Sequence, residues 1–98
     1  MPATGHISQR GLDLIKHFEG FRSEPYDDNG SPAIGWGHSN RSKKPPLVTP
    51  DLRVTREEAD RILAADLVDY ESQVRAAITT PLKQHQFDAL VSLAYNWG

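Results

Sequence analysis

Residues 15–38 read IKHFEGFRSEPYDDNGSPAIGWGH, and this stretch decides the fold because it joins a helical pattern to a hairpin pattern. Before Gly20, apolar residues recur at the spacing of one helix face. Ser8 precedes this pattern as a candidate N-cap, and Gly20 is a natural stop. We therefore predict an amphipathic helix over 9–19, with Glu19 at its C-terminal end.

The second half of the stretch has the features of strands joined by a tight turn. The dipeptide Asn29-Gly30 is the strongest short signal for a β-hairpin. Residues 33–38 are typical of a strand interrupted by glycines, where another backbone or a ligand can approach closely. Residues 39–50, which contain several prolines, predict a stiff polar loop. We predict a third short strand over 52–54.

Two longer helices are predicted in the rest of the chain. Thr55 and Glu58 form a capping box, and the apolar residues behind them predict a helix over about 56–77. After a break at Pro81, a further helix is predicted over about 84–96. Its apolar face is expected to be larger than the chain can cover, and consists of Phe87, Leu90, Val91, Ala94, Tyr95 and Trp97.

The composition is typical of one small globular domain, taken here as residues 1–98. The chain is 38% hydrophobic and 24% charged, which are ordinary values. A net charge of −2 does not favour nucleic acid as a partner. No apolar run is long enough to span a membrane, and we expect no signal peptide. Since there is no cysteine and no metal or P-loop motif, we expect no metal and no cofactor.

Two carboxylates are the main candidates for chemistry. Glycoside hydrolysis needs one carboxyl group that keeps its proton and one that is ionised. Glu19 suits the first role, because a helix C-terminus and neighbouring phenylalanines favour the protonated form and raise its pKa. Asp28, at a hairpin tip, suits the second role. By composition alone, a glutamate at a helix end is usually a solvated surface residue, and an aspartate before Asn-Gly is usually a turn residue.

The order and spacing of the motifs resemble bacteriophage-type lysozymes, the endolysin muramidases. The likeness rests on residues 15–22, on Tyr26-Asp27-Asp28 followed by residues 34–38, and on residues 81–98. The resemblance implies an α+β, lysozyme-like fold with a small β-hairpin lobe and a helical lobe that is truncated at the C-terminus here. It also implies hydrolysis of the β-1,4 bond between N-acetylmuramic acid and N-acetylglucosamine, with inversion and without a metal.

The resemblance also assigns roles to residues. Glu19 matches the general acid of the family, and Asp28 matches the carboxylate that positions or activates water. Asp27 is a rival, but a strand alternates its faces, so Asp27 is expected to face away from Asp28. The predicted substrate-binding residues are Tyr26, Ser31 and Asn96.

One position departs from the family pattern. Ala33 stands where the family has a threonine whose hydroxyl holds the attacking water. Three outcomes are open: Ser31 supplies the hydroxyl, water alone bridges in place of a hydroxyl, or the activity of the site is impaired.

The remaining histidine and aromatic residues have two readings each. The resemblance implies that His38 pairs with Asp66 rather than binding a metal. Trp36, Tyr26 and Trp97 either stack on sugars or belong to the core.

Bacterial peptidoglycan is the predicted partner, with no nucleic acid and no membrane. We expect synthesis in the cytoplasm of a bacterial host during phage infection, followed by action on the cell wall. The chain is shorter than family members and is interpreted as a fragment, so residues 84–98 are expected to self-associate or to receive a missing C-terminal segment. The alternatives are a non-catalytic glycan- or partner-binding module, an inactive fragment, and a structural part of a virion.

Overall fold

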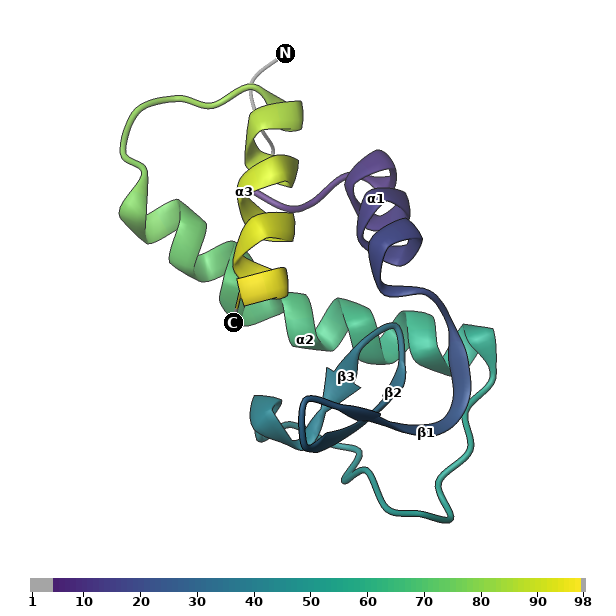
Figure 1. The fold of residues 1–98 in the computed structure, drawn as a ribbon. Helices are drawn as coiled ribbons and strands as arrows, with labels where there is room; N and C mark the ends of the chain where they lie inside the picture. Colours follow the sequence, from purple (N-terminus) through teal and green to yellow (C-terminus); the bar gives the residue numbers. More distant parts are fainter. Residues whose placement is uncertain (1–4, 98) are drawn as a thin grey trace. The chain divides into compact units, whose positions relative to one another are not determined.

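The computed structural model describes residues 5–97, which form an α+β structure. The elements in chain order are α1 (Gln9–Glu19), β1 (Arg22–Asp28), β2 (Ser31–Gly35), β3 (His38–Ser39), the short 3-10 helix η1 (Asn40–Ser42), α2 (Arg56–Ala77) and α3 (Gln84–Trp97) (Figure 1). The described chain divides into two compact units, residues 5–17 with 67–97 and residues 18–66. The continuous helix α2 contributes to both units. No helix within residues 5–97 is long and apolar enough to cross a membrane.

Helix α1 has the bounds that the sequence predicts. The Ser8 hydroxyl accepts a hydrogen bond from the Gly11 N–H at 3.3 Å, as an N-cap does. After Glu19, Gly20 adopts a φ of 71°, a left-handed conformation that commonly ends helices and that glycine adopts without steric cost. The helix therefore ends with Glu19 in its last turn.

The predicted hairpin is confirmed. Strands β1 and β2 are antiparallel, and Asn29 and Gly30 connect them with φ values of 51° and 87°. Positive φ at both central positions is the mark of a type I′ turn, whose twist matches that of the two strands. The sequence Asn-Gly thus determines where the chain reverses.

The register of this hairpin places four side chains on one face. Asp28 is paired with Ser31, and Tyr26 is paired with Ala33. Directly opposed residues of an antiparallel pair share a face, and so do alternate residues of one strand. Asp27, between the two, therefore faces the other side of the sheet.

The predicted strand over 33–38 is wrong in its extent. Strand β2 ends at Gly35, and β3 begins at His38 after a turn at Trp36 and Gly37. Gly35, the last residue of β2, and Gly37 have φ values of 67° and 92°, so the backbone leaves the extended conformation at these two glycines. The glycines therefore reverse the chain and make a three-stranded sheet in the order β1-β2-β3.

The predicted strand over 52–54 is also wrong, because these residues belong to no strand. The Leu52 N–H donates to the Thr49 carbonyl at 3.1 Å, so this N–H is engaged in a local turn and not in strand pairing. The Val54 N–H donates to the Ser23 carbonyl of β1 at 3.0 Å. This bond ties the loop to the sheet without extending it.

The sheet packs on the N-terminal half of α2 within the unit of residues 18–66 (Figure 1). Gly35 lies so close to the helix that a Cβ atom there would be 3.1 Å from the Cβ of Ala59. The indole N–H of Trp36 donates to the Asp60 carboxylate at 2.8 Å. The turn after β2 is thus fixed to α2 by close packing and by a hydrogen bond.

Helix α2 begins at the predicted capping box. The Glu58 N–H donates to the Thr55 hydroxyl at 3.1 Å, and the Thr55 N–H donates to the Glu58 carboxylate at 2.9 Å. Behind the cap, the buried residues Ala59, Leu63 and Leu67 recur every fourth position along one helix face. The 22 residues of α2 agree with the predicted bounds.

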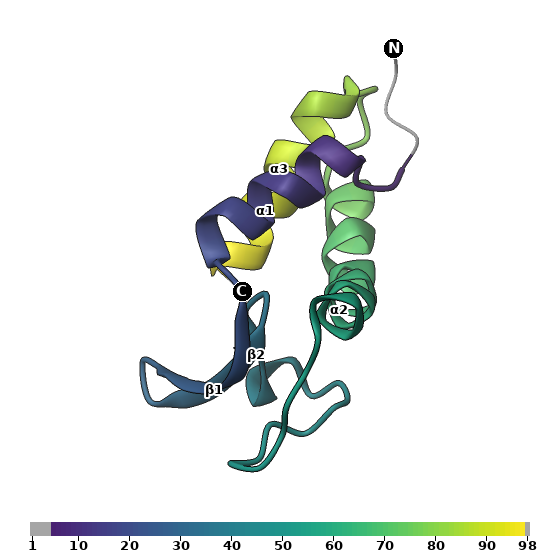
Figure 2. The ribbon, with the colours of Figure 1, turned by 90° about the vertical axis from the view of Figure 1, so that its right-hand side faces the viewer.

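In the other unit, α1 lies beside α3, and a buried carboxylate joins the two helices (Figures 1 and 2). Asp88 of α3 accepts hydrogen bonds from the Ser8 N–H at 2.9 Å, from the Ser8 hydroxyl, and from the Gln84 side-chain amide at 2.8 Å. The Ile7 N–H donates to the Glu71 carboxylate of α2 at 2.7 Å. The segment before α1 is therefore held by buried polar groups of α2 and α3.

Gly11 is required where α1 meets α3. A Cβ atom there would lie 2.6 Å from the Ile7 Cγ1 and 2.7 Å from the Asp88 Cγ. We expect Gly11→Ala to lower the free energy of unfolding by about 1–2 kcal/mol, because the overlap outweighs the better helix propensity of alanine. Urea unfolding measures this, with the exposed Arg10→Ala as the control. A Gly11→Ala protein as stable as the wild type would contradict the packing.

The prediction of an uncovered apolar face on α3 is wrong for its central residues. Phe87 and Val91 are 3% and 0% exposed. The Tyr95 ring meets the Tyr70 ring of α2 edge-on, with 5.6 Å between centroids. Helices α1 and α2 cover this face, and the large apolar side chains left exposed on α3 are Leu93 and Trp97.

Candidate active site

Glu19 is half-buried at the C-terminal end of α1. Burial raises the pKa of its carboxyl above the ordinary value, and the negative charge of Asp28 raises it further. Such a carboxyl keeps its proton at pH values where an exposed glutamate has lost it. This is the property that a general acid requires.

Asp28 is the last residue of β1 and lies beside a cation that the sequence analysis missed. The guanidinium of Arg41, in η1, donates to the backbone carbonyls of Asp28 and Asn29 at 2.9 and 3.2 Å. It also lies 3.9 Å from the Asp28 carboxylate. Arg41 therefore holds the hairpin turn and the end of β1 in place. Its position 13 residues after Asp28 gave no signal in the sequence.

The structure separates Asp28 from its rival Asp27. Asp27 is exposed, and its carboxylate accepts a long hydrogen bond of 3.4 Å from the Gly30 N–H of the turn. Asp27 lines a hollow together with Pro25, Tyr26 and Pro32. Asp28, by contrast, raises the pKa of Glu19. The alternation of faces predicted from the sequence is confirmed.

Tyr26 belongs to the same electrostatic cluster. Its pKa is raised mainly by burial, then by the negative charges of Glu19 and Asp28, against the opposing effect of Arg22. The guanidinium carbon of Arg22 is 5.1 Å from the centre of the Tyr26 ring, a cation–π distance. The structure therefore brings Glu19, Tyr26 and Asp28 within electrostatic range of one another.

The predicted pairing of His38 with Asp66 is confirmed. The His38 Nδ1 lies 2.7 Å from an Asp66 carboxylate oxygen, and its Nε2 lies 2.8 Å from the Pro46 carbonyl. Both side chains are almost fully buried. Burial lowers the pKa of His38, but the hydrogen bonds to Asp66 and Pro46 and the charge of Asp66 outweigh it, so the pKa is raised. Since both ring nitrogens face acceptors, a proton on each satisfies both.

Comparison with known proteins assigns this chain to a family. The sequence profile described as phage lysozyme matches residues 16–98. The chain belongs to the phage lysozyme family. The endolysin of Salmonella phage P22 is 36% identical over 93 residues, which cover 94% of this chain and 63% of that protein.

Two solved structures support the same fold. An endolysin from Escherichia coli O157:H7 phage FAHEc1 is 38% identical with a TM-score of 0.86, over 100% of this chain and 61% of that chain. The muramidase domain of SpmX from Asticaccaulis excentricus is 40% identical with a TM-score of 0.79, over 95% and 60% of the two chains. The chain spans 35–63% of the length of the curated relatives that it matches.

The phage lysozyme site departs from the predicted pattern at Ala33. This residue is fully buried, opposite Tyr26 on one side and Ser39 on the other. Ser31 is half-buried and directly opposite Asp28, so it carries a hydroxyl on the face where Asp28 lies. The register places Ser31 opposite Asp28, and its part as the polar partner of Asp28 stays a prediction.

The aromatic candidates are divided by burial. Trp36 is a core residue, with 8% exposure and a hydrogen bond to Asp60, so of its two readings the core one is confirmed. Arg56 of α2 lies over the rings of Phe21 and Trp36, at 4.6 and 5.5 Å from their centres. Trp97 is 83% exposed.

The other predicted residues have separate outcomes. Asn96 is exposed near the end of α3, in the unit that does not contain Glu19, and its part in substrate binding stays a prediction. Within residues 5–97, no group of three or more metal-ligating side chains is close enough to hold a metal ion.

Proposed function

We propose that this phage lysozyme is a muramidase, which hydrolyses the β-1,4 bond between N-acetylmuramic acid and N-acetylglucosamine in bacterial peptidoglycan. The observation that carries the proposal is the raised pKa of Glu19 next to the charge of Asp28. Two carboxyl groups in unequal environments are what glycoside hydrolysis requires. The family membership of the chain supports the choice of substrate.

The proposed roles follow from protonation. Glu19 keeps its proton and donates it to the oxygen of the leaving sugar, so that the glycosidic bond breaks without release of an alkoxide. Asp28, with the Ser31 hydroxyl beside it, orients a water molecule and takes a proton from it as the water oxygen attacks the anomeric carbon from the opposite face, with inversion. Tyr26 and Asn96 contact the substrate.

Ser31 should contribute to the rate because the family threonine is replaced by Ala33. We expect Ser31→Ala to lower the rate of glycan cleavage about 2- to 10-fold, the effect of one lost hydrogen bond. Ser23→Ala changes an exposed serine of the same hairpin and is the matched control. Initial rates on purified peptidoglycan measure the difference. Equal rates for both variants would leave water alone as the bridge to Asp28.

The proposed reaction can be tested directly. Purified peptidoglycan is treated with the protein, and the new reducing ends are reduced with borohydride and identified by mass spectrometry. A muramidase yields muramitol ends, whereas cleavage of the other glycosidic bond yields glucosaminitol ends. Absence of either product, with retained binding to peptidoglycan, would favour the second candidate function, a non-catalytic glycan-binding module. The observation that favours this second function is Ala33.

We also propose that the exposed end of α3 is a contact surface, for a second copy of the chain or for a further segment of the protein. Leu93 and Trp97, four positions apart, are 54% and 83% exposed. We expect a concentration-dependent rise in sedimentation coefficient that Leu93→Lys abolishes, because a charge cannot be buried there cheaply. The matched control is Val68→Lys, on α2. A monomer at all concentrations would contradict self-association.

The proposed location follows from the same function. The protein is synthesised in the cytoplasm of a bacterial host and acts on the cell wall. Fractionation of infected cells tests this.

A further inference from the structure

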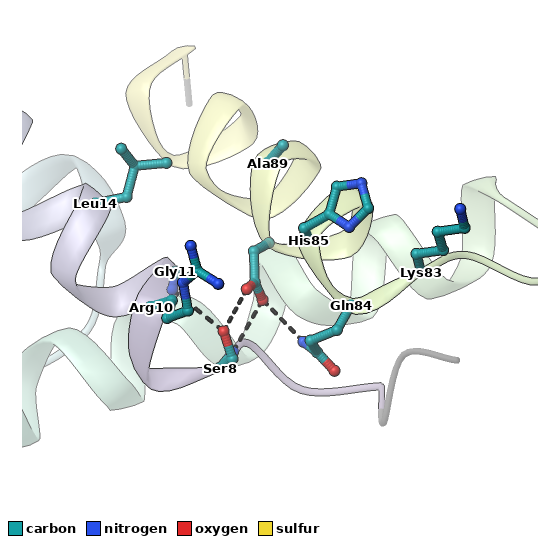
Figure 3. A pocket seen from close by; sticks show the side chains of 9 residues that line it. Ser8, Arg10, Gly11, Leu14, Lys83, Gln84, His85 and Ala89 are labelled. Atoms are coloured by element: carbon teal, nitrogen blue, oxygen red, sulfur yellow. Dashed lines mark hydrogen bonds between the residues drawn. The ribbon is translucent and has the colours of Figure 1, made fainter. Parts of the chain in front are cut away.

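The carboxylate of Asp28 is held differently from a carboxylate with a structural part. Asp88 of α3 is buried and accepts three hydrogen bonds, from Ser8 and Gln84 (Figure 3). These donors fix its orientation and occupy its lone pairs. Asp28 is partly exposed, and among residues 5–97 its carboxylate accepts no hydrogen bond. Its oxygens are therefore free to bind water, but no hydrogen-bond donor fixes their direction.

Arg41 is the cation that lies beside this carboxylate. One terminal nitrogen of its guanidinium donates to the carbonyls of Asp28 and Asn29 at 2.9 and 3.2 Å. The other terminal nitrogen lies 3.9 Å from an Asp28 carboxylate oxygen. Within the described part of the chain, no other cationic side chain is within salt-bridge distance of Asp28. Because the guanidinium is a rigid planar fork, one side chain fixes the backbone of Asp28 and attracts its carboxylate.

The backbone of Arg41 is itself fixed by side chains of its own loop. Its N–H donates to the hydroxyl of Ser39, the N-cap of η1, at 3.3 Å. The Ser42 hydroxyl donates to the Ser39 carbonyl at 2.9 Å. The Asn40 side chain donates to the Val48 carbonyl at 3.2 Å and accepts from the Val48 N–H at 2.7 Å. The guanidinium therefore extends from a backbone whose position is defined by hydrogen bonds, as precise support of a site requires.

The position of this cation suits one of the two carboxyl groups and not the other. The raised pKa of Glu19 has two causes, which are burial and the negative charge of Asp28. A cation close to Glu19 would favour the loss of its proton and so oppose its part as an acid. Arg41 lies instead beside Asp28, the group whose proposed part needs a negative charge.

We propose that Arg41 is a positioning residue for the attack of water, which directs the Asp28 carboxylate and does not contact the substrate. The proposal rests on the proposed function for its reaction. In that step the water oxygen bonds to the anomeric carbon, one water proton passes to Asp28, and the Glu19 proton passes to the departing oxygen. At 3.9 Å the guanidinium makes no hydrogen bond to the carboxylate, so both carboxylate oxygens remain available to water.

Steady-state rates on solubilised peptidoglycan test the proposal. Arg41→Gln should lower kcat about 5- to 50-fold, because misplacing a catalytic group by about 1 Å costs up to about 100-fold in rate. KM should change less than about 2-fold, since the contacts with the substrate remain. Arg41→Lys keeps the charge but not the planar fork, so it should restore part of the lost rate. A raised KM with an unchanged kcat would overturn the proposal and make Arg41 a substrate-binding residue.

Arg53 provides a matched control on the same sheet. Its guanidinium donates to the carbonyls of Pro50 and Leu52 at 3.0 and 2.8 Å, and it lies 3.7 Å from the carboxylate of Glu24 on β1. These contacts resemble those of Arg41 but involve a carboxylate outside the candidate site. Arg53→Gln should keep kcat within about 2-fold of the wild type, and both glutamine variants should melt within about 5 °C of it, because exposed ion pairs contribute little to stability. Equal losses of rate in the two variants would overturn the proposal.

A double variant tests whether Arg41 acts through Asp28. If it does, adding Arg41→Gln to the Asp28→Asn protein should lower the remaining rate less than about 2-fold. A general effect on the fold would not depend on the carboxylate, so its loss would multiply with that of Asp28→Asn. Losses that multiply would therefore overturn the proposal.

The orientation of the Asp28 side chain can be measured without reference to activity. The Hα–Hβ couplings of Asp28 in NMR should show one dominant χ1 rotamer in the wild type and in Arg53→Gln, and rotamer averaging in Arg41→Gln. If Arg41→Gln does not fold, Arg41→Lys takes its place in each measurement. Equal couplings in the wild type and the Arg41 variant would overturn the proposal. If the wild type cleaves no glycan, the proposed function fails, while these couplings still decide whether Arg41 directs Asp28.

Discussion

Glu19→Gln should lower glycan cleavage about 10²- to 10⁴-fold, the usual contribution of a general acid. Glutamine has nearly the same shape but no acidic proton, so the leaving sugar would depart without protonation. The end of α1 should be preserved, because the change leaves the cap at Gly20 intact. Initial rates on peptidoglycan measure the loss, and a circular dichroism melting curve checks the fold. Undiminished cleavage would remove Glu19 from the mechanism.

The two neighbouring aspartates provide a test of the second carboxylate and its matched control. Asp28→Asn should also lower the rate strongly, whereas Asp27→Asn, on the opposite face of the hairpin, should change it little. The charge of Asp28 raises the pKa of Glu19, so Asp28→Asn should bring that pKa closer to its ordinary value, and Asp27→Asn should not. Carbon NMR titration of the Glu19 carboxyl measures this without reference to activity.

The raised pKa of Glu19 also predicts the pH dependence of the reaction. A general acid works only in its protonated form, so the rate should fall as pH rises through the pKa of Glu19. Because that pKa is raised, the active range extends above the pH at which an exposed glutamate ionises.

His38→Asn should destabilise the protein by about 3–5 kcal/mol, the usual cost of breaking a buried ion pair from one side. The change leaves the buried Asp66 carboxylate without its cation. One oxygen of this carboxylate already lacks a hydrogen-bond partner among the described residues. Its surroundings therefore offer little to stabilise the negative charge once the imidazolium is removed. Urea unfolding of both proteins measures the difference. His85→Asn, which changes an exposed histidine, is the control and should be near neutral.

The sign of the pH dependence follows from the raised pKa of His38. The folded state binds the proton more tightly than the unfolded state, so the imidazolium form stabilises the fold. This contribution is complete below the ordinary pKa of histidine and is lost as pH rises through the higher folded value. The difference between wild type and His38→Asn should therefore be larger at about pH 6 than at about pH 9. Equal differences at both pH values would contradict a charged pair.

Much of the candidate site could be predicted because it depends on local rules. Alternation along β1 separates Asp27 from Asp28, and this needs only the knowledge that the segment is a strand. The position of Glu19 at a helix end follows from Gly20. Arg41 could not be predicted in the same way, because its contact with Asp28 depends on how the loop after β3 folds back. The burial of Trp36 likewise depends on contacts with residues distant in the sequence, among them Asp60 and Arg56 of α2.

Local sequence determined the elements whose signals lie within a few residues. The Asn29-Gly30 turn, the Thr55 cap and the Gly20 stop are satisfied by backbone conformation and short-range hydrogen bonds, so their bounds agree with the prediction. Only the tertiary structure decided where β2 ends and that residues 52–54 form no strand. Residues 52–54 have strand-like composition, but a turn and a single hydrogen bond to Ser23 of the edge strand β1 use their backbone. Strand β2 ends at Gly35, where the chain lies close to Ala59 of α2. Such outcomes depend on which surfaces meet across long sequence separations, and neither periodicity nor local propensity contains that information.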